Sequence, residues 1–338
     1  MKAIVHDVYG PADVLELREV DKPSVGDDEV LIEVRAAGLD PGVWIFMTGR
    51  PMAVRLAAGL RRPKVAVLGR AVAGVVVAVG AGVTRLRPGD EVYGTCQSGS
   101  FAQYATARQH RLAPKPANLT FEQAAAMPIS AVTALQSIRD ARVQPGQRVL
   151  ITGAAGGVGS FAVQLVKLHG ASVTGVCSTS KIELVRSIGA EDVIDYTQHE
   201  IDRGGARYDI IIDTAGNRPL SLLRRATTPR GTIALVGGGH ATGWLLGGFQ
   251  RQLAAPLLSL IGSQRVRGVA AREHYEDLDE LTTLTEAGSV TPVIDRTYAL
   301  ADAPDAMRYL AQGHPAGKIV VTVQPSRERH STIPATAI

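Results

Sequence analysis

Cysteines, aromatic residues and long apolar runs are scarce in this sequence of 338 residues, and each scarcity excludes a class of protein. The two cysteines, Cys96 and Cys177, cannot build a disulfide framework or a four-cysteine zinc lobe, so we expect both to be buried as small apolar side chains. No apolar run approaches the ~20 residues that span a bilayer, and the opening MKAIVHDVYG lacks the apolar core of a secretory signal. We therefore expect no membrane partner and a cytoplasmic location.

A strong excess of one charge is also absent. Lysine and arginine number 36 against 32 acidic residues, for a net charge of +4, and the basic stretches are short. Aromatic residues make up only 4% of the chain and none is interleaved with these basic stretches, so we expect solvated basic surfaces and no nucleic-acid partner. A small polyanionic ligand remains open.

Residues 1–119 contain strand-like runs separated by Gly, Pro and Asp turns. Apolar residues recur with a period of two in runs such as DEVLIEVRAAGL and VAGVVVAVGAGV, and no long window has a helical period. A period of two predicts strands with one buried face. We therefore expect residues 1–119 to form a mostly antiparallel β domain.

From residue 120 the pattern changes to alternating strands and helices. The helix-like FEQAAAMPISAVTALQSI precedes the strand-like runs RVLIT, SVTGVC, YDIIIDTAG and TIALVGGG, with helix-like segments between them. These βα units predict a doubly wound parallel sheet in 120–264, in which the apolar stretch 243–262 is a buried helix, or else a substrate lid or dimer surface. We expect 265–323 to return to the first domain and 324–338 to be a flexible tail.

The stretch RVLITGAAGGVGSFAVQLVK, residues 148–167, joins a strand-like run to an amphipathic helix through a glycine-rich turn. Gly153, Gly156, Gly157 and Gly159 remove side chains there, so a ligand can approach the first N–H groups of the helix at the positive end of its dipole. Close packing of strand on helix is the alternative reason for the glycines. Because the turn heads a series of βα units, it predicts a dinucleotide-binding site.

The end of the next strand-like run indicates which dinucleotide binds. An NAD site usually has an acid there, about 20 residues beyond the glycines, that binds the ribose 2′-hydroxyl. This run ends VCSTSK, in which Ser178, Thr179 and Lys181 could bind and neutralise a 2′-phosphate instead. We therefore expect NADP(H) as the cofactor. A helix cap at Ser178 or Ser180 beside a solvated Lys181 is the alternative, and both can hold at once.

TGAAGGVG also fits the glycine turn of short-chain dehydrogenases, but no tyrosine from Tyr196 to Tyr309 has the lysine four positions later that those enzymes need. The sequence resembles instead the medium-chain dehydrogenase/reductase superfamily, in its zinc-free quinone oxidoreductase and enone reductase branch. The resemblance covers about residues 1–323 and rests on MKAIVHDVYGPADVLEL, VLIEVRAAGLDP, VAGVVVAVGAGVTRLRPGDEVYG, GSFAQYA, LTFEQAAAMPISAVTAL and GKIVVTV besides the glycine turn. It implies an α/β protein with a GroES-like β-barrel catalytic domain, a Rossmann doubly wound parallel-sheet domain, NADPH between them, and pairing as a homodimer.

The resemblance also implies which residues contact the cofactor. Thr133 is expected beside the nicotinamide, Tyr196 near the 2′-phosphate, and residues 214–216 and 237–239 along the ribose and carboxamide, while Lys318 is a further candidate for the same cleft. The residues expected to bind the cofactor are Gly153, Gly156, Gly157, Val158, Gly159, Ser178, Thr179, Lys181, Tyr196, Thr214, Gly216, Gly237, Gly238 and Lys318.

Zinc-dependent members of the superfamily carry a Cys in the segment that matches AAGLDP and a His-Glu pair in the segment that matches LGRAVAG. This sequence has Leu39 and Asp40 in the first segment and Arg70 and Ala71 in the second. A zinc site needs about three nitrogen, sulfur or carboxylate ligands, which these segments do not offer. We therefore expect no bound metal.

The proton donor also differs from that of the relatives. Where they tend to have a tyrosine this sequence has Ile45, which leaves Asp40, Trp44 and Thr48 as candidates for the catalytic pocket and solvent as another proton source. Asp40 is either a general acid or a residue that caps the following turn. Trp44 and Phe46 either line an apolar substrate pocket or pack in the core.

Without a metal to polarise it, the substrate must itself be a good hydride acceptor, and conjugation provides this by spreading negative charge onto an oxygen. We therefore expect NADPH-dependent hydride transfer to a small apolar quinone or α,β-unsaturated carbonyl compound. Two alternatives are a specialised biosynthetic enoyl reductase and a non-catalytic NADPH-binding protein.

Overall fold

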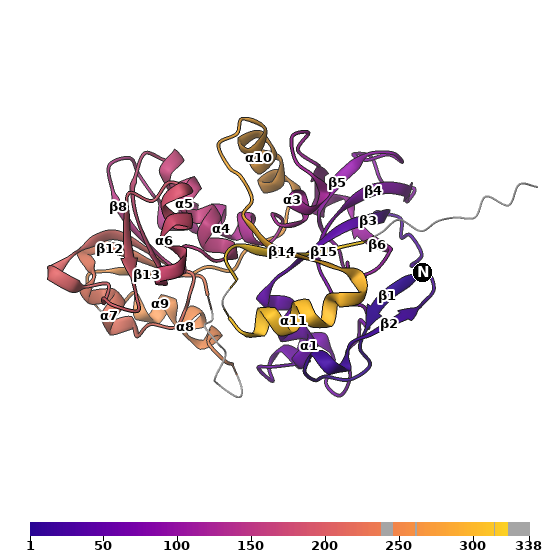
Figure 1. Ribbon diagram of the computed structural model, residues 1–338, viewed down its shortest axis with the longest axis horizontal. Helices are drawn as coiled ribbons and strands as arrows, with labels where there is room; N and C mark the ends of the chain where they lie inside the picture. The colour runs from indigo at the N-terminus through magenta and orange to yellow at the C-terminus, as the bar shows by residue number, and fades with distance from the viewer. Residues whose placement is uncertain (238–245, 261, 314, 324–338) are drawn as a thin grey trace, which may run out of the picture.

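The structure is a computed structural model that describes residues 1–237, 246–260, 262–313 and 315–323; the expected tail, 324–338, lies outside these residues. Two large β-sheets lie toward opposite ends of the molecule (Figure 1). None of the described helices has both the length and the apolarity that crossing a bilayer requires.

The N-terminal sheet is mostly antiparallel. Its strands are β3 (Glu29–Leu39), β4 (Ala71–Val79), β5 (Glu91–Thr95), β6 (Tyr104–Arg108), β7 (Leu112–Pro114), β14 (Ile294–Ala299) and β15 (Lys318–Thr322). The order is β14-β15-β3-β4-β5-β7, with β6 paired to β3, and only β14 and β15 run parallel to each other. Burial alternates along most of β3, as one buried face requires. The predicted antiparallel domain is therefore confirmed, with a hairpin of β1 (Lys2–Val5) and β2 (Glu16–Glu19) beside it.

Two helices that the sequence analysis did not predict, α1 (Pro41–Thr48) and α2 (Val54–Ala58), connect β3 to β4. Helix α1 has proline in its first turn and ends at Gly49 with φ 60°, which are ordinary start and stop signals. Its apolar residues are consecutive (VWIFM) rather than spaced along one stripe, so periodicity did not reveal it.

The second sheet is wholly parallel. Its strands are β8 (Arg148–Thr152), β9 (Ser172–Cys177), β10 (Asp192–Asp195), β11 (Tyr208–Asp213), β12 (Thr227–Leu235) and β13 (Arg265–Gly268), in the order β10-β9-β8-β11-β12-β13. The order reverses between β8 and β11, and such a reversal is where doubly wound sheets bind ligands. The predicted Rossmann sheet is therefore confirmed.

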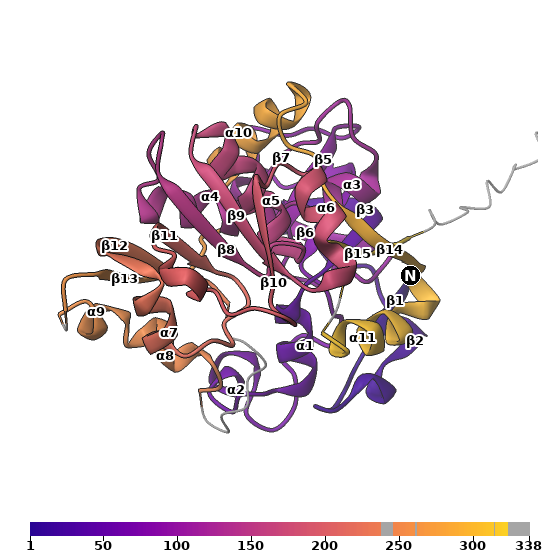
Figure 2. The same cartoon turned by 60° about the vertical axis from the view of Figure 1, so that its left-hand side comes forward.

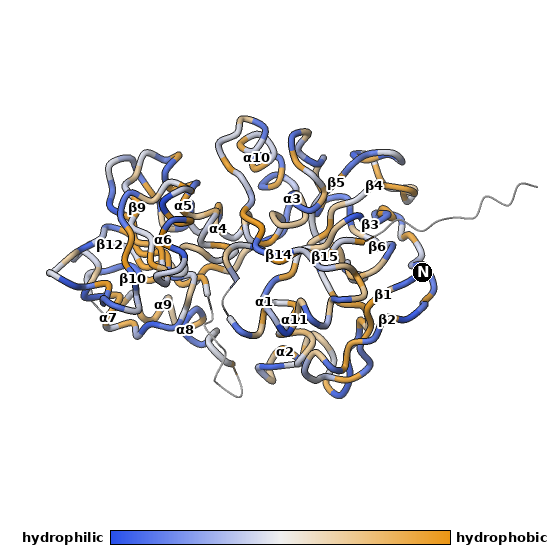
Figure 3. The backbone as a smooth tube through the Cα atoms, viewed as in Figure 1, coloured by the Kyte–Doolittle hydropathy of each residue, from blue (hydrophilic) through white to orange (hydrophobic). Residues whose placement is uncertain are grey.

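Helices cover both faces of this parallel sheet (Figure 2). In β8, Val149 and Ile151 belong to the core cluster that includes α4 and α5, whereas Leu150 belongs to a second cluster with α7. Successive side chains of a strand point to opposite faces, so a strand between two helical layers must be apolar throughout. Figure 3 shows the strands of the parallel sheet as largely hydrophobic. The bounds are α4 (Ser130–Ala141), α5 (Gly157–Leu168), α6 (Ile182–Ser187) and α7 (Leu220–Arg225).

Two elements lie across the domain boundaries expected from the sequence. Strand β13 begins just beyond residue 264, yet it pairs with β12 in the parallel sheet. Helix α3 (Phe121–Ala125) begins just beyond residue 119, yet it packs on β3 and β4. The remaining elements are α8 (Phe249–Leu253), α9 (Ala255–Leu258), α10 (Tyr275–Glu286), α11 (Ala303–Ala311) and the 3₁₀ turns η1 (Ala12–Val14), η2 (Gln109–Arg111), η3 (Thr179–Lys181), η4 (Arg203–Gly205) and η5 (Leu300–Asp302).

The stretch 243–262 is not a buried helix in its described part. It forms α8 and α9, on which Ala255 is buried, but Leu253 and Leu257 are each 68% exposed and Leu260 is 81% exposed. The prediction of a buried helix is therefore wrong for the face that carries these leucines. The two short helices pack one side on β13 and leave the leucines exposed to solvent.

Candidate active site

The turn between β8 and α5 has the geometry needed to receive a phosphate. Gly153 has φ 63°, and Gly156 is the N-cap of α5 without a side chain to cap the first turn. A Cβ on Gly159 would lie 2.1 Å from the carbonyl oxygen of Gly153, so only glycine allows α5 to approach β8 this closely. The N–H groups of Gly157 and Val158 have no acceptor within their own helix. Close packing therefore accounts for Gly159, and access of a ligand to these N–H groups stays a prediction.

A buried ion pair lies beside this turn. Lys318 and Asp40 side chains are 2% and 5% exposed; the Lys318 ammonium contacts Asp40 Oδ1 and donates to the Leu39 carbonyl at 2.9 Å. The Ser130 hydroxyl donates to the same Asp40 oxygen at 3.2 Å. A Cβ on Gly157 would lie 3.0 Å from Lys318 Cδ and 3.2 Å from Ser130 Oγ. Strand β15, which begins at Lys318, and helix α4, which begins at Ser130, therefore both contact the glycine turn.

Asp40 does not cap the turn that follows it. It occupies the N-cap position of α1, but its side chain makes no capping hydrogen bond and instead accepts from Lys318 and Ser130. The capping alternative is therefore wrong, because the carboxylate bonds the buried Lys318 ammonium and not the N–H groups of the first turn of α1. Its role as a general acid stays a prediction.

Ser178 and Tyr196 follow the carboxyl ends of two adjacent strands, β9 and β10, at which Cys177 and Asp195 are paired. The Thr179 hydroxyl donates to Asp195, and this hydrogen bond is the main cause that holds the pKa of Asp195 below its usual range. The structure thus brings Ser178, Thr179 and Tyr196 together. The Thr179 hydroxyl already donates to Asp195, so it is not a free donor for a phosphate.

Two cations flank these residues. Lys181 donates to the Pro315 carbonyl at 3.1 Å, and partial burial lowers the pKa of its ammonium. The guanidinium carbon of Arg218 lies 5.8 Å from the centroid of the Tyr196 ring. The sequence analysis missed Arg218, although its position shortly after the expected ribose segment 214–216 was a usable signal. Two cations and several hydroxyls are a suitable donor set for a phosphate.

Asp213, which the sequence analysis also missed, is fully buried at the end of β11. Its Oδ1 accepts from the Thr152 hydroxyl at 2.7 Å and from the Gly216 N–H at 3.2 Å, and Arg251 Nη2 lies 3.3 Å from Oδ2. The Gly237 N–H donates to the Asp213 backbone carbonyl at 3.0 Å. Asp213 therefore holds the ends of β8, β11 and β12 together. An acid that ends the apolar run YDIIID was its signal in the sequence.

The segments expected along the ribose and the carboxamide, which begin at Thr214 and Gly237, lie together at the carboxyl ends of β11 and β12. The Thr214 hydroxyl donates to the Thr152 carbonyl, and a Cβ on Gly237 would lie 2.0 Å from the Thr214 carbonyl oxygen. Glycine is therefore required at residue 237. Gly238 lies outside the described residues, so its expected contact stays a prediction.

The expected catalytic hydroxyls bond within their own helices. Thr133 donates to the Ile129 carbonyl at 2.7 Å, and Thr48 donates to the Trp44 carbonyl at 2.9 Å. Trp44 packs against a core cluster of the N-terminal domain, whereas Phe46 lines a cavity of about 300 Å³. The catalytic roles of Thr133, Thr48 and Trp44 stay predictions.

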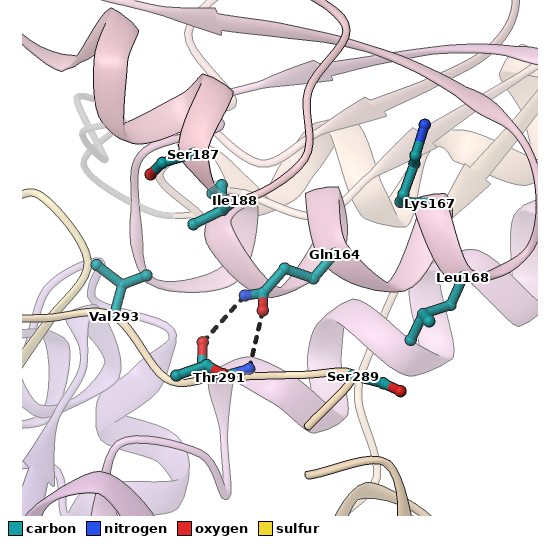
Figure 4. A pocket seen from close by; sticks show the side chains of 8 residues that line it. All are labelled: Gln164, Lys167, Leu168, Ser187, Ile188, Ser289, Thr291 and Val293. Atoms are coloured by element: carbon teal, nitrogen blue, oxygen red, sulfur yellow. Dashed lines mark hydrogen bonds between the residues drawn. The ribbon is translucent and has the colours of Figure 1, made fainter. Parts of the chain in front are cut away.

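A second hollow, of about 280 Å³, lies at the other end of α5 from the glycine turn (Figure 4). The Gln164 amide accepts from the Thr291 N–H at 2.8 Å and donates to the Thr291 carbonyl at 3.0 Å. This pair of hydrogen bonds fixes the connection between α10 and β14 on α5, which is a structural role.

The residues that replace the zinc ligands do not fit a zinc ion. Asp40 is paired with Lys318, and Arg70 Nη2 contacts Glu273 Oε2 at 2.6 Å. Cys96 is buried, and this burial raises the pKa of its thiol to about 12. Within the described residues, no group of three or more His, Cys, Asp or Glu side chains could hold a metal.

A parallel sheet with a glycine turn at its order reversal, joined to an antiparallel domain, defines a two-domain dinucleotide-dependent oxidoreductase. Residues 26–117 match the alcohol dehydrogenase GroES-like domain family, and residues 188–321 match the zinc-binding dehydrogenase family. The chain belongs to the medium-chain dehydrogenase/reductase family, in its quinone oxidoreductase and enone reductase branch.

Similar proteins extend over almost the whole chain. The NADPH-dependent alkenal/one oxidoreductase of Arabidopsis thaliana chloroplasts is 34% identical, over 95% of this chain and 79% of that protein. The quinone oxidoreductase of Coxiella burnetii has a TM-score of 0.83 at 28% identity, over 96% of this chain and 99% of its own. The Escherichia coli quinone oxidoreductase complexed with NADPH has a TM-score of 0.81 at 25% identity, over 95% of this chain and 100% of its own.

Proposed function

We propose that this chain is an NADPH-dependent reductase that transfers hydride, without a metal, to a quinone or an α,β-unsaturated carbonyl compound. The observation that carries the proposal is the uncapped start of α5, which opens on the junction of Gly157, Ser130 and Lys318. The activities named for the Arabidopsis and Coxiella relatives support it.

The bound dinucleotide supplies the hydride, and the chain binds and orients it. The first N–H groups of α5 hold the pyrophosphate, because they lack partners and lie at the positive end of the helix dipole. Ser178, Lys181, Tyr196 and Arg218 hold the 2′-phosphate. The backbone around Gly216 and Gly237, which Asp213 keeps in place, would hold the ribose and the carboxamide.

Substrate choice follows from the residues that replace the zinc ligands, because Asp40 and Arg70 are held in ion pairs with Lys318 and Glu273. A simple ketone needs a Lewis acid to accept hydride at a useful rate, whereas a conjugated acceptor needs only hydrogen-bond donors at the oxygen where charge develops. Solvent supplies the proton for the adjacent carbon, since Ile45 replaces the relatives' tyrosine and Asp40 accepts two hydrogen bonds.

The test is the absorbance of reduced nicotinamide during incubation with a panel of quinones and enones. We expect oxidation of NADPH, products reduced at C=C rather than C=O when the acceptor is an enone, and equal rates with and without a chelator. Tight NADPH binding with no turnover on any acceptor would identify a non-catalytic binding protein instead. A loss of rate with chelator would contradict the metal-free reaction.

We propose that the molecule is a homodimer. Within the described residues, β13 is the last strand of the parallel sheet and no strand pairs with its outer edge, and the exposed Leu253 and Leu257 lie on α8 and α9, which contact β13. Pairing two copies along this edge covers both features. Light scattering should give a dimer for the natural chain and a monomer for the Leu253→Glu, Leu257→Glu variant. A monomeric natural chain, or an unchanged mass for the variant, would contradict the proposal.

A cytoplasmic location remains a proposal, because the Arabidopsis relative is chloroplastic. Fractionation of the producing cell, followed by immunoblotting, tests it.

A further inference from the structure

The segment that connects β3 to β4 carries cations and no acids. From residue 41 to residue 89 the chain has no aspartate and no glutamate. Five cations lie in and around α2: Arg50, Arg55, Arg61, Arg62 and Lys64. The net charge of the whole chain is +4, so all other residues together carry −1. The positive excess of the chain is therefore matched by this one short segment.

Most of these cations have no counter-charge in the protein. Four of the five are exposed and take part in no ion pair among the described residues: Arg50, Arg61, Arg62 and Lys64. The exception is Arg55, whose Nε donates to the Gly49 carbonyl at 3.0 Å and whose guanidinium lies over the Tyr9 ring. Unpaired, exposed cations gathered in one segment attract an anionic surface.

Apolar side chains are exposed between these cations. Leu56 is 74% exposed, Leu60 is 68% exposed and Val65 is 48% exposed. Helix α2 lies at the lower edge of the molecule in both Figure 2 and Figure 3. Leucines interspersed with arginines are typical of interfacial segments, in which the apolar side chains enter the acyl boundary of a bilayer and the cations contact the lipid phosphates.

The loop after α2 is held in place at its base. The Lys64 N–H donates to the Ala58 carbonyl at 2.8 Å, and the Tyr9 hydroxyl donates to the Gly59 carbonyl at 2.6 Å. These bonds order the loop without using the side chains at its tip, residues 60–62. The tip is thus positioned in advance, which lowers the entropic cost of binding a surface.

We propose that this part of the surface docks on an anionic lipid bilayer. Its members, here called the α2 patch, are Leu56, Leu60, Arg61, Arg62, Lys64 and Val65. A bilayer with anionic headgroups offers negative charge for the cations and an apolar layer for the leucines. A single-stranded nucleic acid would need aromatic side chains for base stacking, and the stretch 50–65 has none.

The proposal departs from the expectation of no membrane partner. That expectation was based on the lack of an apolar run long enough to span a bilayer, and a contact at the bilayer surface needs no such run. The docking does not depend on the reductase function, and none of its tests measures turnover.

The binding test is sedimentation of the full chain with vesicles made of equal parts of phosphatidylcholine and phosphatidylglycerol, compared with vesicles of phosphatidylcholine alone. We expect binding to the anionic vesicles only, and weaker binding as salt is raised. The triple variant Arg61→Gln, Arg62→Gln, Lys64→Gln should lower the partition coefficient on the order of 100-fold, because each cation contributes about fivefold. Its Tm should not change, since these side chains have no ion-pair partner to lose.

The matched control removes the same charge from the parallel-sheet domain. It carries Arg142→Gln, Arg207→Gln and Arg230→Gln, three exposed positions. We expect a loss of no more than a few-fold, because salt screens charges that lie beyond about 10 Å from the bilayer. Equal losses in the two triple variants would mean that net charge alone acts, and would overturn the assignment to the α2 patch. Failure of the natural chain to bind anionic vesicles would overturn the docking itself.

Entry of the leucines into the bilayer is tested with a dye. Leu60→Cys can be labelled selectively with an environment-sensitive fluorophore, because Cys96 and Cys177 are buried. Its emission should shift to shorter wavelength on anionic vesicles. Leu168→Cys, at an exposed leucine of α5, is the control and should not shift.

Two results of the dye experiment would contradict the proposal. An unshifted Leu60→Cys label on vesicle-bound protein would mean that another surface makes the contact. A shift that appears without vesicles, as the protein concentration is raised, would assign the α2 patch to contact between copies of the chain instead of lipid.

Discussion

Replacing Lys318 with methionine is expected to lower the free energy of unfolding by about 3–5 kcal/mol and the Tm by roughly 10 °C. The substitution keeps the apolar stem but removes the ammonium that contacts Asp40 and Leu39. Asp40 would then be a buried carboxylate with Ser130 as its remaining donor, and its Oδ2 already has no partner among the described residues. Chemical denaturation followed by fluorescence measures the loss.

A second substitution tests the cause. Adding Asp40→Asn to Lys318→Met removes the uncompensated charge, so the double variant should recover much of the lost stability. Lys167→Met is the matched control, because the ion pair of Lys167 with Glu191 is exposed and should contribute about 1 kcal/mol or less. A Lys318 variant no less stable than the Lys167 variant would mean that the buried pair does not support the fold.

The sequence predicted the parallel sheet because its signals are local. Runs such as VLI in β8 are apolar at every position, and a strand covered by helices on both sides needs that composition. The glycine turn is local too, because Gly153, Gly156 and Gly159 serve backbone geometry within a few residues. Features set by neighbours in the chain could therefore be predicted.

The surroundings of the Asp40 and Gln97 side chains could not be predicted, because they depend on distant parts of the chain. Asp40 looked like a helix cap from its neighbours, yet it bonds Lys318, 278 positions away. Gln97 is an ordinary polar residue in the sequence, and only the folded structure shows that its buried amide has no hydrogen-bond partner among the described residues. Thr179, predicted to face a phosphate, donates its hydroxyl hydrogen bond to Asp195 on the next strand.

Replacing Lys181 with alanine is expected to weaken NADPH binding about 10- to 100-fold while changing NADH binding less than twofold. The two cofactors differ only in the 2′-phosphate, so a charged hydrogen bond to that group, which contributes about 1.5–3 kcal/mol, is lost for NADPH alone. Isothermal titration of each dinucleotide with the variant measures the two dissociation constants directly, without reference to turnover.

The structure supplies two comparisons that make this result specific. Lys167→Ala removes the same charge from the same domain at the far end of α5, so it isolates the local effect of Lys181 from the net charge of the surface. Arg218→Ala should weaken NADPH binding selectively as well, because the Arg218 guanidinium lies 5.8 Å from the ring of Tyr196, another residue expected at the 2′-phosphate. Because opposite charges are screened when exposed, both losses should shrink as salt is raised. If Lys181→Ala weakened both dinucleotides equally, its contact with Pro315 would be structural, and selectivity for the phosphorylated cofactor would have to come from Arg218 or from the hydroxyls alone.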